Sequence, residues 1–295
     1  MGINSNSGTD GVTPSLIKIV VAAVSALIIF TFFSAFTASA ESDVTKLSKP
    51  RLIAEAQYDS AATHPYNKQT TQLIVRYKKV EDALKYQIYI KGGEYEGWTK
   101  IKTTKALKAK ITGLERGKTY SFKVRAVNGD VKSPFSETQK LSTALMSFDK
   151  AGFEAICRIV YHEVGKSDKK MWEKPIVYVA DCVVNRYVAA KYKKIALWSK
   201  YYKKYNDVQS MIYNSGNFMS SASLTYDGAA YSKVTDKVKT AVYGALYNKA
   251  ALSGIKNDKT VYYWCNRSYY QNDSRIAYSF KIPWGYFNVW TEYWG

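Results

Sequence analysis

The chain has 295 residues, of which 46% are hydrophobic, and this length is sufficient for two ordinary domains. Lysine and arginine outnumber aspartate and glutamate by 43 to 24, which gives a net charge of +19 that attracts nucleic acid, anionic lipid or an anionic cell wall. Because the charge is spread along the chain, solubility with weak polyanion affinity explains it as well as wall binding. The chain has three cysteines, an odd number that allows one disulfide at most and therefore no disulfide framework.

The N-terminal region contains an export signal. Residues 1–15 form a polar tail, and residues 16–40 carry a nearly continuous apolar run followed by Ala38-Ser39-Ala40, a small-residue cleavage site. The run is long for a signal peptide, so an uncleaved membrane anchor is the alternative. Both interpretations predict a secreted or membrane-anchored protein with both domains extracellular, which touches the membrane only through this segment. Residues 41–48 are a short linker.

Residues 49–145 show the alternation typical of β-strands. The segments 73–77, 86–90 and 120–127 alternate apolar and polar residues, and glycine-containing turns such as Gly92-Gly93 and Asn128-Gly129 separate them. Several short strands with regular turns predict a β-sandwich.

Within this segment, residues 114–120 have the spacing that places Tyr120 at a sandwich corner. With the later Val127-Asn128-Gly129 and the run 133–136, the segment resembles a fibronectin type III domain, although Tyr77 stands where that family usually has tryptophan. The resemblance implies a spacer or a binding module.

Residues 146–295 change to helical periodicity. Ser147 is a candidate cap for a helix reaching Val164, and Pro175 is a candidate first residue of a second helix. Asp207 and Thr235 are candidate caps of two later helices, and the segments 260–264 and 286–290 are expected to be strands. Helices first and strands last predict an α+β domain.

The residue types of this domain narrow its chemistry. A catalytic zinc needs several ligands rich in histidine, and the domain has only His162. Cys157 lies five residues before His162 on the same expected helix, about 140° away around its axis, so the two cannot form a nucleophile–base pair. There is no G-x-S-x-G motif and no phosphate-binding glycine loop. Cys157 and Cys182 lie in apolar runs and are expected to be buried, inert thiols. We expect neither a metal nor a cofactor.

Carboxylate chemistry remains, and helical-wheel geometry selects Glu163. It follows Ile156, Ile159 and Val160 by seven, four and three residues, so on an α-helix it projects from their apolar stripe. A carboxylate held against apolar side chains has a raised pKa, as a general acid needs. The alternative is a helix-end glutamate paired with lysine or arginine.

Aromatic composition favours a carbohydrate ligand. The domain holds 19 of the 26 tyrosines and 6 of the 7 tryptophans. Most of these rings are expected to serve packing, but rings in a cleft stack on sugar faces.

Three segments in order resemble the spore cortex-lytic cell wall hydrolases, the SleB/CwlJ-like family. The run 160–165 resembles its Tyr-x-Glu-Ala block, 180–186 its Val-x-Asn-Arg helix end, and 213–218 its Gly-Gln-Phe segment. Val164 replaces the usual alanine, Asn217 the usual glutamine, and the final signature is present only as 284–287.

The resemblance implies a mostly helical, lysozyme-like cortex-lytic catalytic domain that cleaves the N-acetylmuramic acid–N-acetylglucosamine bond of peptidoglycan. Glu163 would be the catalytic acid and base of a lytic transglycosylase. The resemblance also implies peptidoglycan as partner and a set of substrate-binding candidates, which are Asn185, Asn217, Phe218, Tyr161 and Tyr286.

Two other functions stay open at this point. One is an N-acetylmuramoyl-L-alanine amidase, against which the lack of a histidine set argues. The other is a non-catalytic adhesin that binds glycan or anionic wall polymers through charge and aromatic rings. Nucleic acid is not expected as a partner, because the protein is expected to be exported.

Overall fold

The computed structural model describes residues 44–54, 68–167, 169–247, 255 and 259–291. The polar tail and the signal peptide or membrane anchor predicted at residues 1–40 lie outside these ranges, as do the first residues of the linker. Among the described residues, none of the helices has both the length and the apolar character needed to cross a bilayer.

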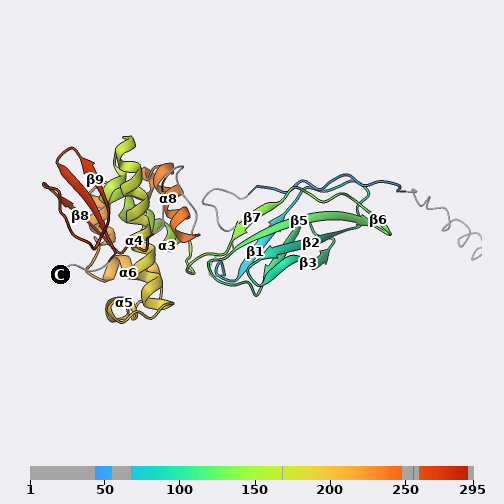
Figure 1. Ribbon diagram of the computed structural model, residues 1–295, viewed down its shortest axis with the longest axis horizontal. Helices are drawn as coiled ribbons and strands as arrows, with labels where there is room; N and C mark the ends of the chain where they lie inside the picture. Colours follow the sequence, from blue (N-terminus) through green and yellow to red (C-terminus); the bar gives the residue numbers. More distant parts are fainter. Residues whose placement is uncertain (1–43, 55–67, 168, 248–254, 256–258, 292–295) are drawn as a thin grey trace, which may run out of the picture. The chain divides into compact units, whose positions relative to one another are not determined.

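The middle region consists of two antiparallel sheets. One has the strand order β3-β2-β5-β6, with β7 also paired to β5, and the other pairs β1 with β4 (Figure 1). The strands are β1 (Gln72–Arg76), β2 (Lys85–Gly92), β3 (Tyr95–Thr104), β4 (Lys108–Thr112), β5 (Thr119–Asn128), β6 (Val131–Lys132) and β7 (Gln139–Ser142). This arrangement is the predicted all-β sandwich.

The sandwich core follows the period of two in the sequence. Tyr120, Phe122 and Val124 of β5 are fully buried, and the residues between them are half-buried. The predicted strands 73–77, 86–90 and 120–127 coincide with β1, β2 and β5 within a few residues. Strand β3 was not predicted, because it contains no buried residue and therefore no apolar alternation.

Tyr120 fixes the corner of the sandwich, as its spacing predicts. Its hydroxyl accepts a hydrogen bond from the Glu115 backbone N–H (2.9 Å) and donates one to Glu94 Oε2 (3.0 Å). The ring leaves no room beside it: a Cβ at Gly93, where φ is +59°, would lie 2.6 Å from the Tyr120 ring. A buried hydroxyl with two partners ties three loop and strand segments together.

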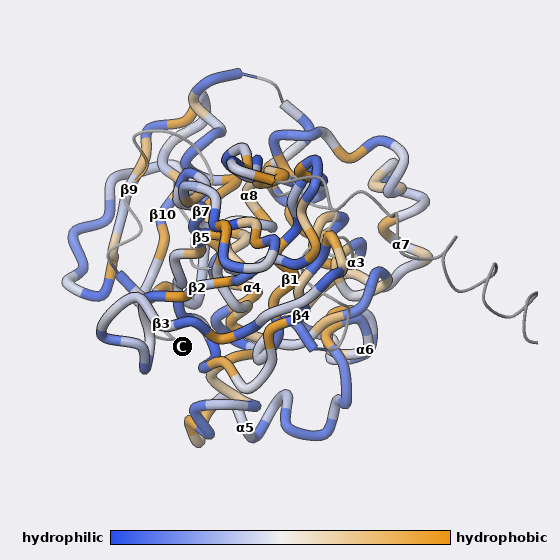
Figure 2. Tube along the Cα trace, turned by 90° about the vertical axis from the view of Figure 1, so that its right-hand side faces the viewer, coloured by the Kyte–Doolittle hydropathy of each residue, from blue (hydrophilic) through white to orange (hydrophobic). Residues whose placement is uncertain are grey.

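The following region is helical and ends in a three-stranded sheet of order β8-β10-β9. Its elements are α3 (Lys150–Val160), a π-helical turn η1 (Tyr161–Gly165), η2 (Lys170–Trp172), α4 (Glu173–Lys191), α5 (Ala196–Tyr202), α6 (Val208–Asn214), α7 (Ser221–Tyr226), η3 (Tyr231–Lys233), α8 (Asp236–Leu246), β8 (Tyr263–Arg267), β9 (Ile276–Ile282) and β10 (Gly285–Trp290). Helix α4 is the centre, because it contacts α3, α5, α8 and β8. The loops at the periphery of the view in Figure 2 consist largely of hydrophilic residues.

The helix caps match the sequence in two cases of three. Asp207 accepts from the Ser210 N–H and Thr235 from the Val238 N–H, as predicted. The prediction of Ser147 as the first cap is wrong, since Asp149 accepts from the Gly152 N–H at 2.7 Å. Either residue type can cap, and the aspartate lies directly before the first helical residue.

The predicted position of Glu163 on the apolar stripe is also wrong. The stripe itself is correct, since Ile156, Ile159 and Val160 are fully buried. After Val160, however, the helix widens to the π form, in which i→i+5 hydrogen bonds put more residues in each turn. The α-helical wheel therefore no longer applies, and Glu163 points outward and is exposed.

Cys157 and Cys182 are buried as predicted, and all three cysteines are free thiols. Burial raises the pKa of both Cys157 and Cys182, so neither is an activated nucleophile.

Replacing Tyr120 by phenylalanine will destabilise the sandwich by about 1–2 kcal/mol, because the Glu115 N–H and the Glu94 carboxylate each lose their partner while the ring stays in place. Chemical unfolding of Tyr120→Phe measures this free energy. Tyr226→Phe is the control, since Tyr226 is almost fully exposed. Equal stability of the two variants would refute the assigned role of the Tyr120 hydroxyl.

Candidate active site

Glu163 lies on the wall of a pocket of about 290 Å³ in the helical region. Its side chain is 30% exposed. Trp264 Nε1–H donates to Glu163 Oε2 at 3.0 Å, and His162 Nε2 lies 3.9 Å from Glu163 Oε1. Glu163 is the one carboxylate among the described residues that line this pocket.

The Glu163 backbone is fixed by close packing of the π-helical turn. Val164 is buried directly after it, and Gly165 packs so tightly against α8 that a Cβ at this position would lie 2.6 Å from Val238 Cγ2. A side chain at residue 165 would push the turn away from α8 and displace Glu163. π-Helical turns inside α-helices occur frequently at functional sites.

Trp264 is held in place by Arg186, a buried cation on α4. The Arg186 guanidinium lies 5.0 Å from the Trp264 ring centroid and 5.3 Å from that of Phe218, and Arg186 Nε donates to the Tyr262 carbonyl at 2.6 Å. The Phe218 and Trp264 rings stack with centroids 6.4 Å apart. Cation–π contacts of a desolvated arginine orient rings, so this cluster directs the Trp264 N–H toward Glu163.

Two further tryptophans line the same pocket. Trp172 is buried and Trp284 is 59% exposed, and their ring centroids are 5.5 Å apart. Trp284 lies on the turn between β9 and β10, which Gly285 permits: its φ is +143°, and a Cβ there would lie 2.0 Å from the Arg267 carbonyl oxygen. An exposed indole beside a carboxylate is suited to stacking on a sugar ring.

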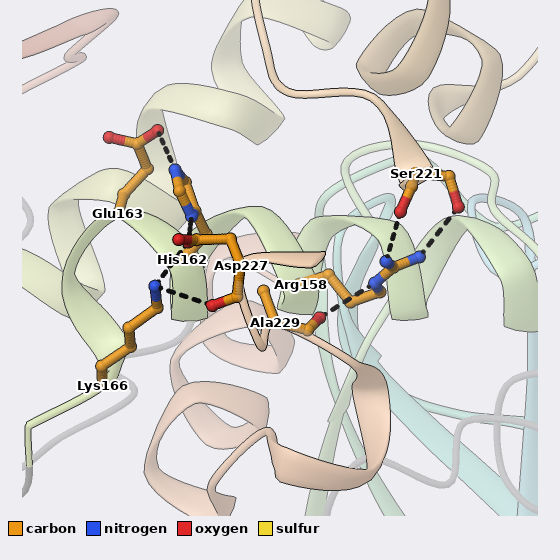
Figure 3. A network of polar contacts seen from close by, with 7 residues as sticks. All are labelled: Arg158, His162, Glu163, Lys166, Ser221, Asp227 and Ala229. Carbon is orange, nitrogen blue, oxygen red and sulfur yellow. Dashed lines mark hydrogen bonds and ion pairs between the residues drawn. The ribbon is translucent and has the colours of Figure 1, made fainter. Parts of the chain in front are cut away.

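His162 is part of a charged cluster behind Glu163. Its Nδ1 is hydrogen-bonded to Asp227 Oδ2, and Lys166 Nζ donates to the same oxygen at 2.5 Å (Figure 3). These hydrogen bonds, from Lys166 first and His162 second, lower the pKa of Asp227. With Nδ1 committed to Asp227, the imidazole presents Nε2 to Glu163.

Arg158 holds the segment that carries Asp227 against α3. Its guanidinium donates to the backbone oxygens of Ser221 (2.8 Å) and Ala229 (3.0 Å) (Figure 3). It also donates to the hydroxyls of Thr225 and Tyr213. Arg158 and His162 lie one turn apart on consecutive helical segments. The α7 segment is therefore anchored on both sides of Asp227.

Only part of the predicted substrate-binding set gathers at Glu163. The Phe218 ring stacks on that of Trp264, which donates a hydrogen bond to Glu163. The amide nitrogen of Asn185 donates to the Val261 carbonyl (3.0 Å), and that of Asn217 to Ser215 within its own exposed turn (3.4 Å).

The two predicted tyrosines also make contacts away from the pocket. Tyr161 packs against the helical core, and the ring of Tyr286 meets that of Tyr270 edge to face. Neither tyrosine lines the pocket, nor does Asn185, Asn217 or Phe218. A role in binding stays a prediction for all five residues.

Sequence reasoning missed most of the groups that surround Glu163. Trp264 is 101 residues away in sequence, and Asp227 is 65 residues from His162. The abundance of tyrosine and tryptophan favoured a carbohydrate ligand but did not identify the rings that line the pocket. Among the described residues, no three histidine, cysteine or acidic side chains are grouped so that they could hold a metal ion.

Comparison with known families identifies the middle region. The family described as "PBP1-like, fibronectin3-like domain" matches residues 60–136. Together with the strand order, this match makes the middle region a fibronectin type III-like domain. No curated protein matches the chain.

Solved fibronectin type III domains are among the similar structures. The structure of FN3tt mut is 22% identical in sequence to this chain, and the match covers 34% of this chain and 98% of the FN3tt mut chain (TM-score 0.26). The domain of human fibronectin type III domain containing protein 3 is 20% identical over 36% and 91% (TM-score 0.25), and the FN5 domain of Drosophila Lar is 20% identical over 33% and 96% (TM-score 0.26).

Asp227→Asn will make the stability of the protein less sensitive to acid. In the folded chain Asp227 has a lowered pKa, so its stabilising effect is complete above the ordinary value of about 3.9 and is lost as the pH falls through the lower folded value. Unfolding midpoints between pH ~5 and pH ~2 measure this. Asp236→Asn, at an exposed aspartate, is the control. If the stability of Asp227→Asn depended on acid in the same way as that of wild type, the stabilising role assigned to the Asp227 carboxylate would be contradicted.

Proposed function

We propose that this chain is an exported enzyme that cleaves the glycosidic bond between N-acetylmuramic acid and N-acetylglucosamine in peptidoglycan, as a lytic transglycosylase with Glu163 as general acid and base. The observation that carries the proposal is the Glu163 carboxyl group on the wall of an open pocket, which accepts a hydrogen bond from Trp264 and shares the pocket with exposed Trp284. The SleB-like segments and the export signal in the sequence support the same conclusion.

The reaction needs one carboxyl group. Neutral Glu163 gives its proton to the glycosidic oxygen as the bond from that oxygen to C1 of the muramoyl ring breaks. The C6 hydroxyl of the same ring then attacks C1, and the Glu163 carboxylate takes the hydroxyl proton, which yields a 1,6-anhydro end and regenerates the acid. Ordinary glycosidases use two carboxyl groups about 5–9.5 Å apart, whereas the described residues of this pocket supply only Glu163.

The surroundings of Glu163 suit a group that alternates between acid and carboxylate. The Trp264 N–H stabilises the carboxylate that forms when the proton leaves, because an aligned donor acts most strongly on developing charge. Oε1 is left on the side of His162, free of a direct hydrogen bond from a described residue. The fibronectin type III-like domain would then separate the enzyme from the membrane or contact the wall.

Glu163→Gln will lower the release of muropeptides from purified peptidoglycan by at least ~100-fold, because the amide cannot transfer a proton. The matched control is Glu154→Gln on the preceding helix, whose side chain is 31% exposed against 30% for Glu163. Mass spectrometry of the digest measures the products, and circular dichroism checks the fold. Undiminished release by Glu163→Gln would overturn the proposal.

The same digest separates the alternatives. Anhydro-muropeptides are the expected product, whereas free stem peptides would identify an amidase. Binding of wall by both wild type and Glu163→Gln, with no cleavage by wild type, would identify a non-catalytic adhesin.

Trp264→Phe will lower kcat about tenfold with little change in KM, because it removes one N–H hydrogen bond worth about 1.4 kcal/mol to the developing carboxylate and keeps an aromatic ring over Arg186. Trp98→Phe in the sandwich is the control and should leave kcat unchanged. An unchanged kcat in Trp264→Phe would remove Trp264 from the mechanism.

A further inference from the structure

A second open pocket of about 600 Å³ lies beside the one that contains Glu163. The residues that line the two pockets alternate along the same stretch of chain. Lys169 and Trp172 line the first pocket, while Lys170 and Lys174 line the second. On the other side, Phe280 and Lys281 of β9 line the second pocket, and the turn that follows β9 lines the first. The two pockets are therefore lined by neighbouring residues of the same two segments.

The second pocket is strongly positive. Lys170, Lys174 and Lys281 are exposed on its walls and form no ion pair with a described residue. Its one described acidic residue, Glu173, pairs with Lys237 at 3.4 Å. Lys174 Nζ lies 5.6 Å from the Phe280 ring, a contact that leaves its charge available. Three lysines from two segments thus line one open pocket.

We propose that this pocket binds the carboxylates of the stem peptide attached to the glycan strand that Glu163 cleaves, an inference that rests on the proposed function. The peptide is linked to the muramoyl ring, so its negative charge enters with the sugar at the scissile bond. Lysine is suited to this ligand, because an ammonium group on a flexible stem can follow a carboxylate whose position varies. The substrate class is then peptide-bearing glycan.

The test compares two substrates with the full-length protein. One is peptidoglycan that carries its stem peptides, and the other is the same glycan after enzymatic removal of the peptides. The variant Lys170→Gln/Lys174→Gln/Lys281→Gln is compared with Lys193→Gln/Lys200→Gln/Lys204→Gln, which removes the same charge from exposed lysines outside the three pockets. We expect the first variant to lose about tenfold in kcat/KM on the peptide-bearing substrate, the sum of three partly screened ion pairs, and nothing on the bare glycan.

Several results would overturn the proposal: equal losses on both substrates, equal losses in the control variant, or a loss that disappears when the wall is stripped of phosphodiester polymers and keeps its peptides. If the triple variant melts below wild type, the single change Lys281→Gln decides in its place. Cleavage of neither substrate by wild type would refute the proposed function instead. In that case the pocket is tested by binding, which requires no catalysis. The affinity of Glu163→Gln for each of the two substrates is compared with and without the three lysine substitutions.

Discussion

The widening of the helix after Val160 is the constraint on which the rest of the site depends. Had α3 continued in the α form, Glu163 would lie on the buried stripe with Ile159 and Val160. The π-helical turn instead brings its carboxyl group to the surface and presents His162 beside it. Trp264, Asp227 and the two-tryptophan wall are arranged around a carboxylate whose position this single turn determines.

The sandwich was largely predictable, because its information is local. Period-two alternation located β1, β2 and β5, and the spacing of Tyr120 predicted its place at the corner of the sandwich, where its hydroxyl accepts from the Glu115 N–H. Strand β3 lacks that signal, since it contains no buried residue and is held by its backbone pairing with β2. A strand defined by its partner leaves little pattern in its own sequence.

Of the residues at the candidate site, the sequence singled out Glu163 but not its partners. Elimination of other chemistries selected Glu163, but the same wheel geometry placed it against the core, because a helical wheel assumes one period throughout. The partners of Glu163 and His162 come from β8 and from the end of α7, and nothing local marks Trp264 or Asp227 as members of the site. Asn185 shows the converse: it has the expected residue type, but its amide is occupied by the Val261 carbonyl.

The anchoring of the α7 segment by Arg158 has a consequence for how the molecule fluctuates. A segment held only by its own turns opens at a small cost, independently of the rest. Here the backbone on both sides of Asp227 is bonded to a guanidinium on α3, whose opposite face is fully buried. The segment and the helix therefore form one cooperative unit, so amide hydrogens around Asp227 would exchange with solvent on the same slow timescale as those of the helical core.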